Sequence, residues 1–269
     1  MDPQPPAPRR VRTKPEARPG WRARLRRILI WTGAGAGVLA AIAAAYQVDQ
    51  FLASDAHFIL TQANFRLAGV QYAPRDEIVR VFARDFGRSV YLASLAERRR
   101  RLMAIDWVRD ATVSRLWPNR LAVTIVERRP AAFVVLGRET ALIDAEGTIL
   151  RPPDRARFSL PVLAGVTRQQ PPEVRKARAA QAVALLDEAR SYASQISEID
   201  VSDPDNVTVV ELAQGRAVRL LLGNRNYASR LGNFIDHYPD IGRRLPNART
   251  FDLRLDDRIT AQNGGGDGH

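Results

Sequence analysis

One uncharged stretch, ILIWTGAGAGVLAAIAAAYQV at residues 28–48, constrains this chain more than any other feature. A helix rises about 1.5 Å per residue, so a helix of this length spans roughly 30 Å, the thickness of a bilayer's hydrocarbon core. A helix is also the only conformation in which a single segment satisfies its own backbone hydrogen bonds inside lipid. The stretch therefore predicts one transmembrane helix at residues 28–48, with a short tail on one side and a large body on the other.

The flanking charges predict the orientation of this helix. Residues 1–27 carry nine basic side chains against Asp2 and Glu16, which gives nine minus two, or +7, of the net charge of +12. Because positive charge stays on the cytoplasmic side, we expect the tail in the cytoplasm and the body outside it. The membrane-orienting residues nearest the helix are Arg22, Arg24, Arg26 and Arg27.

A cleaved signal peptide is the competing interpretation, because the small residues near Ala41 and Ala43 resemble a cleavage site. The apolar region of a signal peptide is about 7–15 residues long, and the longer stretch here favours a retained anchor. Gly33 and Gly37 form a GxxxG pair, which either seats another helix closely or reflects the abundance of small residues.

Composition bounds the partners of the body. Without the tail the net charge is only +5, from 12 minus 7, so no nucleic-acid surface is expected, and the tail suits anionic lipid head groups. The chain has no Cys, which excludes disulfides and thiol chemistry. Residues 1–27 are predicted to be a disordered basic tail, residues 49–57 a juxtamembrane linker and residues 261–269 a disordered Gly-rich tail.

Residues 58–127 have the pattern of a small unit with the order strand, helix, helix, strand, strand. The first helix is expected to begin at Pro74 and to continue through Phe86. A capping-box pattern at Ser94 to Glu97 predicts the second helix, with Arg98 to Arg101 on its outer side, facing solvent, an acidic partner or lipid heads. We expect Trp107 and Trp117 to pack in the core or in the hairpin of the last two strands.

Residues 128–260 have the pattern of a larger mixed domain. Pro130 interrupts strand pairing and marks its start, and the position of Glu127, Arg128 and Arg129 suggests a hinge between the two units. Short strands alternate with a helix of about twenty residues from Pro172 and a helix from Tyr227 that ends at Pro239. A last strand is expected over residues 250–260. The predicted fold class is α+β, with helices packed on an antiparallel sheet.

Three stretches match a known family in sequence and order. They are DWV at 106–108 with VSRLWPNRL at 113–121, VERRPA at 126–131, and FDLR at 251–254. In these stretches the chain resembles the FtsQ/DivIB family of bacterial cell-division proteins, and the shared order covers nearly its whole length.

The resemblance implies a POTRA domain at about residues 58–127 and an FtsQ-type β-domain at 128–260. It implies a non-enzymatic scaffold of the division machinery, a single-pass type II protein of the inner membrane whose body lies in the periplasm at the division septum. Such a scaffold links early and late division proteins and helps to control septal wall synthesis. The implied partners are FtsB and FtsL, together with FtsK, other division proteins and inner-membrane lipid, with no cofactor, nucleic acid or small-molecule substrate.

In this family the C-terminal strand of the β-domain receives a strand from FtsB. The chain departs from some relatives after the D-L-R match, so the resemblance carries over the backbone role and not particular side-chain contacts. An exposed final strand offers unpaired N–H and C=O groups, which independently suits a partner strand. The expected edge consists of Phe251, Asp252, Leu253, Arg254, Leu255, Asp256, Asp257, Arg258 and Ile259.

Two other functions are the alternatives, a membrane-anchored envelope enzyme acting on cell wall and a POTRA-type transport component. The histidines His57, His237 and His269 are not in a metal-ligand spacing. The carboxylate pairs Asp144/Glu146 and Asp256/Asp257 fall in a turn and in the expected edge strand, which favours structural roles over acid–base catalysis. A transport component would require repeated units or many alternating strands.

Overall fold

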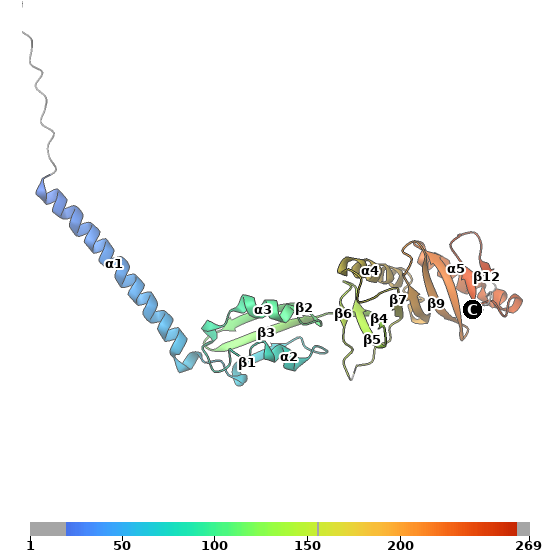
Figure 1. The fold of residues 1–269 in the computed structure, drawn as a ribbon, viewed down its shortest axis with the longest axis horizontal. Coiled ribbons are helices and arrows are strands. Elements are labelled where there is room, and N and C mark those ends of the chain that lie inside the picture. The colour runs from blue at the N-terminus through green and yellow to red at the C-terminus, as the bar shows by residue number, and fades with distance from the viewer. Residues whose placement is uncertain (1–19, 155, 263–269) are drawn as a thin grey trace, which may run out of the picture.

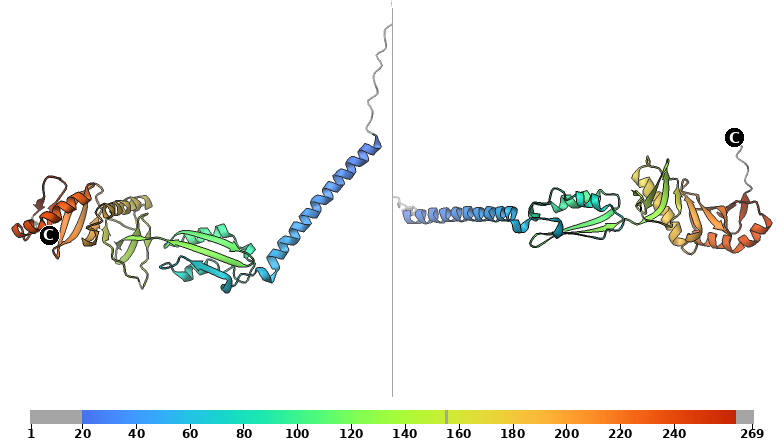
Figure 2. Two further views of the ribbon diagram at one scale, coloured as in Figure 1. Left: turned by 180° about the vertical axis from the view of Figure 1, so that it is seen from behind. Right: turned by 90° about the horizontal axis from the view of Figure 1, so that it is seen from below.

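The computed structural model describes residues 20–154 and 156–262 of the 269. A long N-terminal helix, a small α/β domain and a larger β-domain follow one another along the molecule (Figure 1), and two further views show the same succession (Figure 2). Residues 1–19 of the predicted basic tail and residues 263–269 of the predicted C-terminal tail lie outside the described residues.

The N-terminal helix α1 (Trp21–Ser54) has 34 residues and is longer than the predicted transmembrane segment. It includes the flanking arginines at one end and Asp49 at the other, so most of the expected linker is helical. The helical segment 24–54 is long and apolar enough to cross a membrane. Within its most apolar stretch of 18 residues, no residue is buried in the protein. This segment has the character of a membrane anchor.

The first domain confirms the predicted order strand, helix, helix, strand, strand. Its sheet has the order β1-β3-β2, with β1 parallel and β2 antiparallel to β3. The second helix begins at the predicted place, but the Ser94 side chain forms no capping hydrogen bond. The main elements are β1 (Phe65–Ala68), α2 (Arg75–Arg80), α3 (Leu95–Met103), β2 (Val108–Leu116) and β3 (Arg120–Glu127), with short 3-10 helices η1 (Ala56–Phe58), η2 (Gln62–Asn64) and η3 (Val90–Leu92).

Three expectations for the first domain were wrong. The first helix ends at Arg80, and the chain continues to Gly87 as turns. Arg98 is not on the outer side of α3: it is buried and its Nε lies 2.7 Å from Asp85 Oδ2, because a guanidinium with a carboxylate partner can enter a core. Trp107 is buried as expected, whereas Trp117 is 79% exposed.

The second domain is built on one nine-stranded sheet with the order β12-β11-β10-β9-β8-β7-β4-β5-β6. The sheet is mixed and not wholly antiparallel, because β7 is parallel to both β4 and β8, and β11 is parallel to β10. The strands are β4 (Pro130–Leu136), β5 (Glu139–Asp144), β6 (Ile149–Leu150), β7 (Val162–Ala164), β8 (Ile196–Asp200), β9 (Val207–Ala213), β10 (Arg216–Gly223), β11 (Thr250–Asp252) and β12 (Thr260–Gln262).

Helices α4 (Pro172–Glu188) and α5 (Tyr227–Arg244) contribute to one core cluster with the strands, so both cover the same face of the sheet. The short η4 (Ala193–Gln195) precedes β8. The expected end of α5 at Pro239 was wrong, since the helix runs five residues further. The apolar stripe that includes Leu231 and Phe234 continues to Ile241, and packing that stripe on the core outweighs the single hydrogen bond that proline removes.

The two domains contact each other around residues 127–130. Glu127 binds back into the first domain, where its carboxylate accepts the N–H groups of residues 71, 72 and 73 at 2.7–3.1 Å. Arg128 points the other way and donates to Asp144 Oδ2 at 2.8 Å. Trp107 Nε1 donates to the carbonyl of Arg151 at 2.8 Å. The segment that we expected to be a hinge is therefore fixed by hydrogen bonds to both domains.

Candidate partner-binding edge

Among the described residues, the sheet edge next to the C-terminus is β12, not the whole expected strand 251–259. Within that expected segment only Phe251 and Asp252 are in a strand, and β11 pairs with β10 on one side and β12 on the other. Residues 253–259 form a loop, and β12 follows it as the last strand of the sheet. The expectation of one continuous edge strand was wrong, while an open strand edge does exist a few residues later.

The direction of each backbone N–H and C=O group on β12 follows from the hydrogen bonds between β10 and β11. Arg219 N–H donates to the Arg249 carbonyl at 2.7 Å, and Leu253 N–H donates to the Leu221 carbonyl at 3.0 Å. Because backbone groups alternate along a strand, Thr250 and Asp252 direct theirs toward β12. Their register partners Gln262 and Thr260 then face inward, and the intervening Ala261 directs its N–H and C=O away from the sheet.

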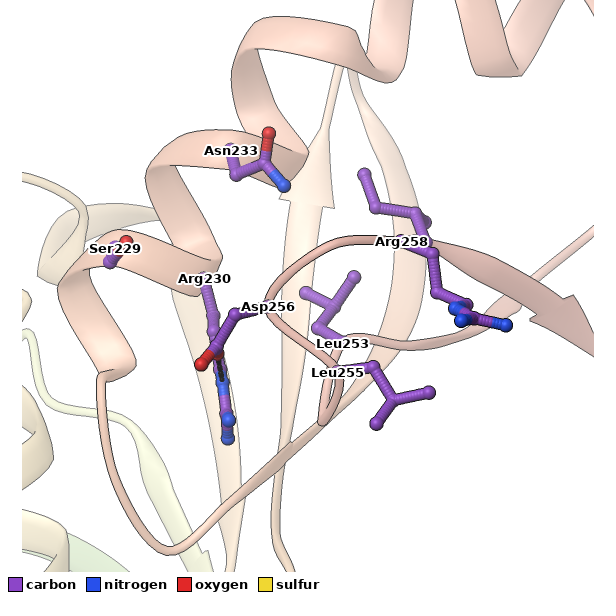
Figure 3. A pocket seen from close by; sticks show the side chains of 8 residues that line it. Ser229, Arg230, Asn233, Leu253, Leu255, Asp256 and Arg258 are labelled. Atoms are coloured by element: carbon purple, nitrogen blue, oxygen red, sulfur yellow. Dashed lines mark hydrogen bonds and ion pairs between the residues drawn. The ribbon is translucent and has the colours of Figure 1, made fainter.

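A buried arginine explains why the chain leaves the sheet after Leu253. Arg230 of α5 is only 6% exposed, and its guanidinium donates to the Arg254 carbonyl at 2.7 Å and to Asp256 Oδ1 at 2.8 Å. A third hydrogen bond goes to the Leu222 carbonyl at 2.5 Å. Figure 3 shows this side chain extending from α5 to the loop that carries Asp256. Asp256 neutralises the charge, the contacts with Arg254 and Asp256 hold the loop against α5, and the contact with Leu222 ties the same side chain to β10.

The loop bounds two cavities beside the edge. One of about 260 Å³ lies between α5 and the loop and is lined by Ser229, Arg230, Asn233, Leu253, Leu255, Asp256, Arg258 and Ile259 (Figure 3). A second of about 360 Å³ includes His237 and Arg258. Leu255 is 56% exposed at the first cavity. An apolar side chain with exposed charged neighbours is a combination found at protein-binding surfaces.

The remaining charges of the loop pair within it. Arg254 folds back on Asp252, with Nη2 at 2.6 Å from Oδ2, and its hydrogen bonds lower the pKa of Asp252. Asp257 pairs with Arg258 at 3.3 Å on the surface, where both side chains are mostly exposed. Because residues 253–259 form a loop, their side chains do not alternate between two faces as they would along the expected strand.

The other proposed sites have structural roles in the described residues. Asp144 Oδ1 accepts the backbone N–H groups of Glu146 and Thr148, and both carboxylates bind Arg128. The hydrogen bond from Arg128 is also the main reason why the pKa of Glu146 is lowered. No group of three or more potential metal ligands is present among the described residues.

The four membrane-orienting arginines, Arg22, Arg24, Arg26 and Arg27, all lie in the exposed first turns of α1. They thus directly precede the apolar part of the helix.

Two important residues were missed in the sequence. Ala261 was assigned to the frayed tail, and nothing in its local pattern identifies it as the outward-facing residue of an edge. Arg230 carried a usable signal, because it falls on the same helical stripe as Tyr227, Leu231 and Phe234. A cation at a core-facing position requires buried acceptors and so predicts a special contact.

Comparison with known proteins agrees with both domains. The model of the POTRA domain, FtsQ-type, matches residues 60–128, and that of the cell division protein FtsQ/DivIB, C-terminal, matches residues 132–254. The extracytoplasmic domain of DivIB from Geobacillus stearothermophilus is similar at 22% identity over 45% of this chain and 95% of that chain, with a TM-score of 0.27, which is too low to support a structural argument.

Several proteins named cell division protein FtsQ are similar over most of the chain. The one from Koribacter versatilis is 35% identical over 203 residues, which are 73% of this chain and 58% of that protein. The one from Novosphingobium aromaticivorans is 29% identical over 84% of this chain and 70% of its own length. Two successive domain matches in the family order, with these relatives, show that the chain belongs to the FtsQ/DivIB family of cell-division proteins.

Proposed function

We propose that this protein is a non-enzymatic scaffold of the bacterial division machinery. In this proposal α1 anchors it in the inner membrane, with the N-terminus in the cytoplasm and both domains in the periplasm at the septum. It binds FtsB and FtsL through the β-domain, contacts FtsK and other division proteins, and helps to control septal wall synthesis. Membership of the FtsQ/DivIB family and the membrane-anchor character of α1 support this role.

The open edge of β12 is the observation that carries the binding proposal. Ala261 offers one outward N–H and one outward C=O, and a partner strand placed beside it would extend the nine-stranded sheet. The loop 253–259 and its two cavities lie next to this edge and offer Leu255 and Arg258 for side-chain contacts. The proposed binding site is therefore β12 with the loop beside it, in place of the expected segment 251–259.

A proline at Ala261 tests this site. Ala261→Pro removes the outward donor and leaves the inward hydrogen bonds of Thr260 and Gln262 to β11 in place. We expect capture of the full-length protein by the periplasmic part of the same organism's FtsB–FtsL complex to fall by about tenfold or more, since a strand addition depends on backbone hydrogen bonds.

The matched control is Ala261→Thr, which keeps the N–H and suits a strand. It should bind FtsB–FtsL like the native chain, and circular dichroism should show that both variants are folded. Equal capture of the proline variant would contradict the β12 site. Lack of capture by the native chain would contradict the proposed partners.

A further inference from the structure

The hairpin between β2 and β3 ends in an exposed apolar tip. Trp117 is 79% exposed and Leu116 is 45% exposed, although large apolar side chains of this kind usually enter a core. Leu92, in η3 of the same domain, is 50% exposed. An exposed tryptophan beside other apolar side chains indicates a contact surface, and its place in the fold indicates what covers it.

The tip lies at the end of the POTRA domain that α1 joins. Arg115, next to the tip, donates from Nε to the Val90 carbonyl at 2.9 Å, which ties the end of β2 to η3. Just before η3, Ser89 Oγ donates to the carbonyl of Leu52 in α1 at 2.6 Å. β1 and β3 are parallel, so the chain enters the domain at the end where β3 begins (Figure 1).

The length of α1 puts this end of the domain next to the outer limit of the lipid head groups. The uncharged run ends at Val48, and α1 continues for six residues from Asp49 to Ser54, which is about 9 Å along a helix axis. The head-group layer on one side of a bilayer is roughly 5–8 Å thick, half the difference between the full thickness and the hydrocarbon core. Trp117 is therefore within a side chain's reach of that layer.

The chemistry of the tip suits a bilayer surface that contains anionic lipid. The indole has an apolar body and a polar N–H, which is why tryptophan collects at membrane interfaces. Arg88 and Arg120 are exposed at the same end of the domain, and neither forms an ion pair within the described part of the chain. Cationic side chains at this level are attracted to anionic head groups.

We propose that the β2–β3 hairpin tip, Leu116 to Arg120, is a second membrane contact of this protein. Trp117 enters the head-group layer of the bilayer that α1 spans, and Arg88 and Arg120 lie against anionic lipid phosphates. A single helix leaves a domain free to rotate about the helix axis, and a second contact removes that freedom. The tip thereby orients the POTRA domain on the membrane. This inference rests on α1 spanning the membrane and not on any protein partner.

Quenching of tryptophan by brominated lipid tests the contact directly. The full-length chain is placed in nanodiscs of phosphatidylcholine and phosphatidylglycerol, with or without bromine on the upper acyl carbons. Trp21→Phe with Trp31→Phe leaves Trp117 and the buried Trp107, and further replacement of Trp117 by Phe isolates its share of the emission. We expect bromine to reduce the Trp117 emission by about twofold or more, since an interfacial indole lies near these carbons.

Two controls separate the possible failures. Leu212 is 50% exposed on β9 of the other domain, so Leu212→Trp, in a chain with Phe at 21, 31 and 117, should keep its emission. A chain that retains Trp31 reports on α1. Quenching of Trp31 without quenching of Trp117 would overturn the tip contact and leave the anchor in place, with a protein partner as the alternative cover for the tip. Quenching of neither would overturn the anchor as well.

Discussion

Glu211 is a carboxylic acid inside the core of the β-domain. Its side chain is 0% exposed, and neither carboxylate oxygen has a hydrogen-bond partner among the described residues. Its neighbours on the same face of β9, Val209 and Ala213, belong to the core cluster. Burial disfavours the ionised form and raises the pKa of Glu211 to about 7, from an ordinary value of 4.5.

This raised pKa makes the stability of the domain depend on pH. Below pH 4.5 the carboxyl is protonated in both the folded and the unfolded chain. Between pH 4.5 and about 7 the unfolded chain releases the proton while the folded chain keeps it, so the free energy of unfolding decreases as pH rises. Above that range the loss is complete, and a shift of this size corresponds to roughly 3 kcal/mol at about 1.4 kcal/mol per pKa unit.

Two substitutions isolate the contribution of this carboxyl. Glu211→Gln keeps the shape and removes the proton equilibrium, and we expect its stability relative to the native chain to increase by roughly 3 kcal/mol between pH 4.5 and pH 8. Glu211→Leu also removes the buried polar atoms and should be more stable than the native chain at both ends of the range. Because other groups titrate equally in all three chains, the difference between variant and native chain is the relevant quantity.

Hydrogen exchange of the β9 and β10 amides, followed across the pH range and corrected for intrinsic exchange rates, measures the opening of this domain alone. If the free-energy difference between the Gln variant and the native chain were the same at pH 4.5 and pH 8, Glu211 would not titrate in this window. The assignment of an unpartnered buried carboxylate would then be refuted.

Two further predictions concern the POTRA domain. Arg98→Met leaves Asp85 buried without its partner and should lower the free energy of unfolding by about 3–5 kcal/mol. Adding Asp85→Leu to this variant should restore much of the loss. Urea unfolding measures both variants, and equal stability of the single and double variants would contradict the pairing. Glu127→Ala removes the acceptor of three backbone N–H groups and should cost about 2 kcal/mol in the same assay. Arg80→Ala, in an exposed ion pair of the same domain, should change stability by less than about 1 kcal/mol.

The sequence predicts elements well where one physical signal dominates. The long uncharged run predicts α1, and the apolar spacing and turn residues predict the order of the five POTRA elements, because these features act locally. Propensity fails at Pro239, where tertiary packing of Ile241 carries the helix past a residue that normally ends one.

The C-terminal edge illustrates what a sequence conceals. Residues 250–260 alternate well enough to suggest one strand, but the hydrogen bonds of Arg230 draw the chain out of the sheet after Leu253. That contact joins α5 to a segment more than twenty residues later, and no local pattern encodes it. Trp117 was wrongly expected to pack, because tryptophan as a residue type favours a core. Its exposure at the hairpin tip is evident only from the fold.

The junction between the domains connects the two proposed contact surfaces. A hinge requires few contacts across it, but Leu142 and Leu150 of the β-domain belong to the same core cluster as the POTRA residues. The rings of Tyr72 and Phe158 also meet across the junction, with centroids 5.4 Å apart. Bending here would expose this apolar surface and break the hydrogen bond from Trp107 to Arg151. The structure therefore favours a fixed angle, so a tip that orients the POTRA domain on the membrane also determines where β12 is held above it.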